Sequence, residues 1–350
     1  MIKELKDIAW NVTEEEYRAD SAFSYSALST FDREGLEGMG KPVKGYPIDF
    51  GSLVDTILTE EDQVENKFVF TNATPPTDVM KDICDELLLL DKPLQEIGVA
   101  KVYEVARNNN YGSANWKKET VHTKVLESIS NYFELMKTVG DKTIMSIDDK
   151  IKADKCVETM FDRFSSYFTD TSFMKHYFQL KFKTNVEFGD NVNKENIEYR
   201  SMFDLINVDY VNKIIYPKDI KTTGKRERDF IDSFYHWRYI YQGFSYTYNL
   251  KKTILEDEYF KDFEIADFSF LVVNRDFPKP FEFILKDSGY KANEPVFKKL
   301  PNVVYNNKVI VPWYVTLYDL YKTYNLNNNK GYKFSENQGV VTIDINQQAR

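Results

Sequence analysis

The chain has 350 residues, of which 42% are hydrophobic and 15% aromatic, enough for one large domain or two average ones. No apolar run reaches the roughly eighteen residues of a membrane helix, and the charged N-terminus lacks a signal-peptide core. These features predict a cytoplasmic protein without a membrane partner. The net charge of -9 argues against nucleic acid, because Lys and Arg dominate phosphate binding. An acidic exterior can still surround a local basic channel.

Cysteine and histidine are few and scattered. Cys84 and Cys156 lie far apart and outside any C-x-x-C motif, which predicts reduced, buried thiols. Two cysteines cannot hold a four-thiolate iron-sulfur cluster. His122, His176 and His236 lie in separate segments, so we do not expect a histidine-based zinc site.

The first sixty residues predict helices. Residues 1–20 have a helical pattern, and a second helix opens at Ser24 or Ser26, either of which is a natural N-cap. A helix N-terminus also binds phosphate well. A third helix is expected at DFGSLVDTIL, and Asp55 can be an ordinary polar position on it.

Residues 65–175 predict a mainly helical stretch. Apolar residues recur at spacings of three, four and seven over 82–90, 120–139 and 148–168. No repeated motif is present. We interpret this stretch as a helical insertion that packs on the core of the protein.

The pattern changes to strands at residue 176. A strand over 176–188 ends at a turn containing residues 189–191, and two β-branched and aromatic runs over 197–208 and 214–220 predict an antiparallel hairpin. Later elements are strands over 266–274 and 281–285, a helix ending near residue 324, and an edge strand over 340–345.

The hairpin carries acidic residues on both arms. Asp204 lies on the first arm and Asp219-Ile220-Lys221 on the second, so strand pairing can bring the two carboxylates together. Mg²⁺ typically takes one or two carboxylates together with water and substrate phosphate. Lys221 lies two residues beyond Asp219 and therefore points to the same side of the strand. The D-x-K spacing alone is a weak signal, since it also occurs at Asp148-x-Lys150.

A basic run and an aromatic helix follow the hairpin. Lys225, Arg226 and Arg228 are suited to contacting backbone phosphates. The helix is expected over about 230–250, and the residues spaced three and four apart on one of its faces are Tyr239, Gln242 and Tyr246. A buried Gln on that face would need a polar partner, which a metal site can provide.

The order Asp204, Asp219-Ile220-Lys221-Thr222-Thr223, Tyr239-x-x-Gln242-x-x-x-Tyr246 resembles the PD-(D/E)XK nuclease superfamily. The similarity is to its RecB-like branch, with the RecE-type (exodeoxyribonuclease VIII-like) and lambda-type phage exonucleases, and covers roughly residues 20–60 and 176–285. It implies an α/β (α+β) fold with a mixed central sheet flanked by helices. The whole chain, 1–350, would be one exonuclease-like domain, with the insertion over 65–175 and the catalytic core over 176–290. The cysteine count excludes the cluster-bearing relatives.

The resemblance implies a metal-dependent exodeoxyribonuclease that digests duplex DNA from an end. Asp204, Asp219, the Ile220 carbonyl and Asp55 would hold Mg²⁺, with Mn²⁺ as the alternative metal. Asp55 departs from the family pattern, which has His there, but Asp is an equally good ligand for these ions. Lys221 would orient or help deprotonate the attacking water.

The resemblance also implies further contacts and partners. Gln242 and Tyr246 would position the site or the strand, while Arg18 and Ser26 fall where the family binds the terminal 5′-phosphate. Expected partners are duplex DNA ends, a single-strand annealing protein and further copies of the chain in a ring. The alternatives are an endonuclease on the same core, a DNA-binding protein with an inactive site, and an α/β domain whose Asp and Lys residues are simply solvated.

Overall fold

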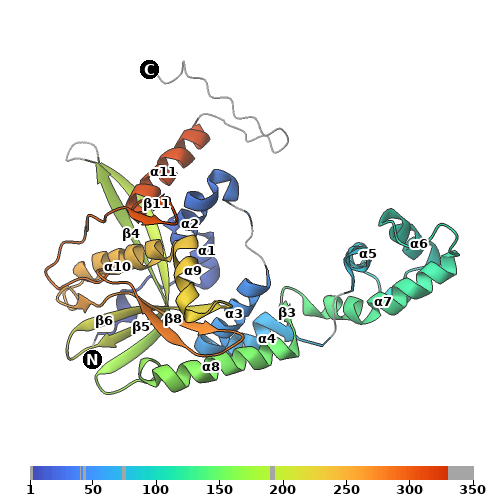
Figure 1. Cartoon of the computed structure of the whole chain (residues 1–350), viewed down its shortest axis with the longest axis horizontal. Helices are drawn as coiled ribbons and strands as arrows, with labels where there is room; N and C mark the ends of the chain where they lie inside the picture. The colour runs from blue at the N-terminus through green and yellow to red at the C-terminus, as the bar shows by residue number, and fades with distance from the viewer. Residues whose placement is uncertain (1–2, 40, 42–44, 73–75, 190–193, 330–350) are drawn as a thin grey trace, which may run out of the picture.

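The computed structural model describes residues 3–39, 41, 45–72, 76–189 and 194–329. Within them the protein is mixed α/β, with a mixed central sheet flanked by helices (Figure 1). The edge strand expected over 340–345 and turn residues 190–191 lie outside the described residues. None of the described helices has both the length and the apolar character needed to cross a membrane.

The central sheet has seven strands in the described part of the chain. Its order is β1-β5-β6-β8-β9, with β4 also pairing β5 and β7 also pairing β6. The strands are β1 (Phe23–Ser24), β4 (Met174–Gly189), β5 (Lys194–Asp209), β6 (Ile214–Thr223), β7 (Glu264–Ile265), β8 (Ser269–Asn274) and β9 (Phe281–Ile284). β4, β5 and β6 are antiparallel neighbours, whereas β6 and β8 are parallel. The hairpin and the strand before it are thus confirmed.

Two small sheets and eleven α-helices complete the described structure. The small sheets pair β2 (Phe68–Phe70) with β3 (Thr143–Met145), and β10 (Val303–Tyr305) with β11 (Lys308–Ile310). The helices are α1 (Glu14–Ala19), α2 (Tyr25–Glu34), α3 (Tyr46–Thr59), α4 (Val64–Lys67), α5 (Asp78–Leu88), α6 (Val99–Asn108), α7 (Lys118–Val139), α8 (Ile147–Phe168), α9 (Phe230–His236), α10 (Tyr239–Leu255) and α11 (Trp313–Asn329).

Helices cover both faces of the sheet. On one face, α9 and α10 bury Phe234 and Leu250 against sheet residues such as Phe270. On the other face, α3 and α8 form a second core with sheet residues; its members include Leu53, Val54, Cys156, Met160, Leu205, Ile220 and Leu271. The sheet is therefore buried on both sides, which explains the long apolar runs of its central strands.

The helical stretch over 65–175 divides into two parts by packing. Helices α5, α6 and α7 share a core of their own and extend away from the sheet as an arm (Figure 1). α8 belongs to the same expected insertion, yet it packs along α3 and the sheet. The predicted insertion therefore contains both a projecting arm and one helix of the central body.

Two segments that were each predicted to form one continuous helix are interrupted in the structure. The helix expected over 230–250 is interrupted between α9 and α10, where Arg238 adopts the left-handed conformation with φ of 60°. α2 holds this turn in place, because Asp32 pairs with Arg238 and two α2 hydroxyls bond to the Trp237 carbonyl. The described part of this segment, residues 3–20, contains a short 3-10 turn, Leu5–Ile8, and the separate helix α1.

Candidate active site

The two strands of the hairpin part at the acidic residues. Their ladder ends at the pair Leu205–Lys218, and beyond it the Asp204 Oδ2 atom accepts a hydrogen bond from the Ile220 N–H at 2.8 Å. β6 continues in register with β8, while β1 pairs with β5 further along at Tyr199. We call the opening between β5 and β6, bounded by Asp204 and Asp219, the fork.

The backbone of both long strands is irregular beside the fork. Phe203 packs in the core under α9 and α10, whereas Leu205 packs in the core under α3 and α8. Residues two apart in a regular strand share a face, so β5 changes face at Asp204. On β4, Gln179 has a φ of 54°, and Gln179 and Asp204 opposite it are both left out of the β4–β5 ladder, whose register is the same on either side. This irregularity turns Asp204 toward the opening.

The fork contains a buried acid–amine–amide group. Asp219 is 2% exposed, and its Oδ2 atom lies 2.5 Å from Lys221 Nζ. Its Oδ1 atom accepts a hydrogen bond from Gln242 Nε2 at 2.5 Å. Lys221 Nζ also lies 4.9 Å from the centre of the Tyr239 ring. Burial alone would lower the pKa of Lys221, but the charges of Asp219 and Asp204 together with the effects of Tyr239 and Tyr25 outweigh burial and raise that pKa, so Lys221 is a cation.

Two further carboxylates share this environment. Burial, followed by the charge of Asp219, raises the pKa of Asp55 to about 7. Burial and the charges of Asp219 and Asp55 raise the pKa of Asp204 well above its ordinary value. Three acids therefore crowd one lysine cation. Ile220 lies between Asp219 and Lys221, with its side chain buried in the opposite core.

The three carboxylates suit a hard divalent cation chemically. Carboxylate oxygens are the preferred ligands of Mg²⁺ and Mn²⁺. A cation would offset both the burial of the charged carboxylates and their mutual repulsion, which together raise the pKa values of Asp55 and Asp204. As they stand, no three Asp, Glu, His or Cys side chains among the described residues are grouped closely enough to hold an ion. Lys221 and Gln242 occupy the Asp219 oxygens. The donor set fits a metal, and its side chains would have to turn toward it.

The raised pKa of Asp55 predicts a pH-dependent stability without metal. The folded chain keeps a proton on Asp55 up to about pH 7, whereas the unfolded chain releases it near pH 4. The folded state therefore binds more protons over this range, and stability falls as the pH rises. We expect the melting temperature of Asp55→Asn to match that of the wild type in EDTA near pH 4 and to exceed it increasingly up to about pH 7, above which the difference levels off. A constant difference across this range would contradict the shared acidic environment.

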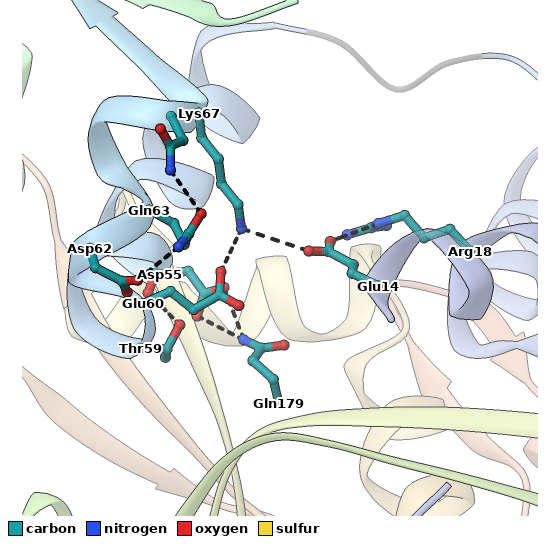
Figure 2. A network of polar contacts seen from close by, with 10 residues as sticks. Glu14, Arg18, Asp55, Thr59, Glu60, Asp62, Gln63, Lys67 and Gln179 are labelled. Atoms are coloured by element: carbon teal, nitrogen blue, oxygen red, sulfur yellow. Dashed lines mark hydrogen bonds and ion pairs between the residues drawn. The ribbon is translucent and has the colours of Figure 1, made fainter. Parts of the chain in front are cut away.

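Figure 2 shows the polar network around Asp55. Gln179 Nε2 donates to the Asp55 carboxylate at 3.1 Å, and Lys67 Nζ lies 2.5 Å from Glu60 and 3.7 Å from Glu14. Helix α3 can carry Asp55 this close to β6 because Gly51 faces Thr222: a Cβ at Gly51 would lie 3.1 Å from the Thr222 hydroxyl. The glycine four residues before Asp55 is therefore explained by the close packing of α3 on β6.

The residues predicted for a terminal phosphate lie at the surface. The Arg18 side chain is 68% exposed, and its guanidinium pairs with Glu14 at 2.6 Å, at the outer end of the Asp55 network (Figure 2). Ser26 is exposed in the first turn of α2. The cap of α2 is Ser24, whose Oγ accepts from the Ala27 N–H. The structure does not bring Arg18 and Ser26 into contact.

Tyrosines line the fork on its α2 and α10 side. Tyr246 is 6% exposed, and its ring lies 5.1 Å from that of Phe203. The sequence prediction missed Tyr25, which begins α2 and lies 6.3 Å from the Tyr239 ring and 6.5 Å from the Tyr246 ring. Burial raises the pKa of Tyr25, on which the charges of Lys221 and Asp219 also act. Gln179 was missed as well, because only the fold brings it to Asp55.

The basic run lies just beyond the end of β6. Lys225, Arg226 and Arg228 are exposed. Arg275, which follows β8, lies next to this run. A Cβ added at Gly224 would lie 3.1 Å from the Arg275 guanidinium. The guanidinium carbon of Arg275 also lies 5.3 Å from the centre of the Tyr46 ring. Arg275 was not singled out in the sequence, because it stands alone there.

Comparison with models of known protein families finds no match, and comparison with curated proteins finds none either. The fork and the residues around it are therefore the features of the protein that indicate its function.

Proposed function

We propose that the protein is a Mg²⁺-dependent exodeoxyribonuclease of the PD-(D/E)XK type, similar to the RecE-type and lambda-type exonucleases, which hydrolyses linear duplex DNA from an end. One observation carries the proposal. Where the hairpin strands part, Asp204 and Asp219 lie beside Lys221 and Gln242, and Asp55 reaches the same opening from α3. A purely structural role would not require three carboxylates to crowd into one partly buried place, because that arrangement costs stability.

Each residue of the fork has a role in phosphodiester hydrolysis. Asp204, Asp219 and Asp55 would hold the cation, with the Ile220 carbonyl as a further oxygen. When bound, Mg²⁺ lowers the pKa of a water and neutralises charge on the phosphate. Lys221, whose pKa is raised, supplies positive charge to the phosphate and orients the water.

The remaining site residues would position the reactants. Gln242 holds one oxygen of Asp219 through its amide N–H. Tyr246 packs against Phe203 and supports the irregular part of β5. Lys225, Arg226 and Arg228, together with Arg275, would contact backbone phosphates without reading bases, so we expect little sequence preference. Arg18 and Ser26 remain candidates for a terminal 5′-phosphate, which Arg18 would bind after exchanging its pairing with Glu14.

The proposal is tested by incubating the purified protein with linear duplex DNA and with covalently closed circular DNA of the same sequence. With Mg²⁺ we expect loss of the linear DNA to nucleotides, survival of the closed circle, and no reaction in EDTA. Mn²⁺ should substitute for Mg²⁺. Failure to degrade either DNA with either metal would contradict the proposal.

The same assay separates the alternatives. Nicking or linearisation of the closed circle would favour an endonuclease on the same core. Metal-independent binding without hydrolysis would favour a DNA-binding protein with an inactive site. The remaining alternative, an α/β domain with solvated Asp and Lys side chains, is disfavoured because Asp219 is only 2% exposed. Assembly into a ring and an annealing-protein partner are extensions of this proposal that rest on the resemblance.

A further inference from the structure

An exposed tryptophan lies next to the fork. Trp237 is 40% exposed and occupies the turn between α9 and α10. Two residues later, Tyr239 places its ring 4.9 Å from Lys221 Nζ. Tyr25 connects the same two places, because its hydroxyl donates to the Trp237 carbonyl at 2.6 Å while its ring lies beside Tyr239. The Trp237 backbone is therefore connected through Tyr25 and Tyr239 to Lys221 of the fork.

The backbone at Trp237 is held in place independently of its side chain. The Trp237 carbonyl accepts hydrogen bonds from the hydroxyls of Tyr25 and Ser29, the latter at 2.7 Å. Arg238 pairs with Asp32 of α2 and fixes the left-handed turn. The backbone therefore holds the indole in a fixed place. Trp237 is not among the buried residues of the apolar cores, so core packing does not explain why a tryptophan stands here.

Positive charge lies beside this indole and beside the preceding residue, His236. The Arg33 guanidinium carbon lies 4.6 Å from the centre of the Trp237 ring. Burial, together with the charges of Arg33, Arg238, Lys225 and Lys308, lowers the pKa of the adjacent His236. Glu34 and Asp32 pair with the two arginines, but Lys225 and Lys308 are exposed and have no ion pair with another described residue. Two lysines are therefore available for phosphates.

An exposed aromatic ring among cations is suited to a single nucleic-acid strand. Unpaired bases stack on aromatic side chains and on Arg planes, while the backbone phosphates are held by basic groups. Inside a duplex the bases are already stacked on one another, and only the terminal pair offers a free face. The chemistry at Trp237 therefore differs from that of the exposed basic run after β6, which suits phosphates of either form of DNA.

We propose that Trp237, with Arg33, Lys225 and Lys308, binds an unpaired DNA strand at the mouth of the fork by stacking on one of its bases. The role of this contact in the reaction rests on the proposed nuclease function: hydrolysis of one strand from a duplex end requires its terminal nucleotides to separate from the complement. A stacking site beside the fork would hold a separated strand and keep the end open.

The test uses binding in EDTA, so that hydrolysis plays no part. A thymidine oligonucleotide of about twelve residues is titrated into the full-length protein, and tryptophan fluorescence is recorded. We expect quenching in the wild type and in Trp116→Phe, and loss of that quenching in Trp237→Phe. Trp116 is a matched control because it also lies beside a cation, 5.1 Å from Lys124 Nζ, but on the helical arm.

A second variant measures the contribution to affinity. Trp237→Ala should raise the dissociation constant for the oligonucleotide about tenfold, and it should fold, because the backbone bonds to Tyr25 and Ser29 do not involve the indole. Thermal unfolding checks this. Three results would each overturn the proposal. They are quenching that persists in Trp237→Phe, a dissociation constant that is unchanged in Trp237→Ala, and Trp237-dependent binding of a blunt duplex that is as tight as binding of the oligonucleotide. Trp237-dependent binding by a protein that hydrolyses no DNA would instead contradict the nuclease proposal and leave the binding site standing.

Discussion

Asp219→Asn is expected to reduce Mg²⁺-dependent hydrolysis of linear duplex DNA by about a thousandfold or more. Asp219 is the one carboxylate of the fork that contacts both Lys221 and Gln242, and an amide cannot supply the negative charge that holds a cation. Charge stabilisation by a bound metal contributes several kcal/mol, and each tenfold in rate corresponds to about 1.4 kcal/mol. Initial rates at saturating Mg²⁺ measure the loss.

The control for this variant is Asp148→Asn. Asp148 begins the same D-x-K spacing, with Lys150, but it is exposed on α8 and far from the fork in sequence. It should retain full activity. If Asp219→Asn hydrolyses DNA as fast as Asp148→Asn does, while both remain folded, the assignment of the site is wrong.

Lys221→Met should abolish hydrolysis and also destabilise the protein. Removal of one partner from a buried ion pair costs about 3–5 kcal/mol, and Lys221 is the cation that offsets the three carboxylates of the fork. Loss of a group that orients or polarises the attacking water reduces the rate by about 10²–10⁴-fold. Urea unfolding and initial rates on the same preparation measure the two effects separately.

Lys218→Met is the matched control for Lys221→Met. Lys218 lies three residues earlier on β6, is 4% exposed, and pairs with Glu282 at 2.9 Å away from the fork. It should also destabilise the protein, because Glu282 loses its partner, but the folded fraction should keep its activity. Equal losses of activity in the two variants would show that Lys221 acts only through stability.

The fold was predictable where a local pattern encodes it. The runs around residues 197–220 have the β-branched and aromatic composition of paired strands, and the hairpin follows from the polar turn between them. The spacing of Gln242 and Tyr246 placed them on one helical face, and Gln242 does contact Asp219. Alternation along β6 likewise placed Lys221 beside Asp219.

The rest depends on contacts between distant segments. The break at Arg238 has neither Gly nor Pro to mark it, since contacts with α2 hold it in place. Tyr25 and Gln179 reach the fork only because β1 and β4 flank β5. The apolar face of α8 packs on α3 and the sheet, whereas α5, α6 and α7 pack on one another. This division could not be predicted, because all these helices have similar apolar spacing in the sequence. None of these features has a local pattern.

The division of the fork among remote segments has a consequence for biosynthesis. Its parts come from α2, α3, the β5–β6 hairpin and α10, and α2 and α3 lie far before the hairpin and α10 in sequence. Contacts of such long range form late in folding. A chain still on the ribosome, with α10 not yet released, would carry the acidic residues without the Gln242 contact. The complete arrangement would form only after α10 has been synthesised and released.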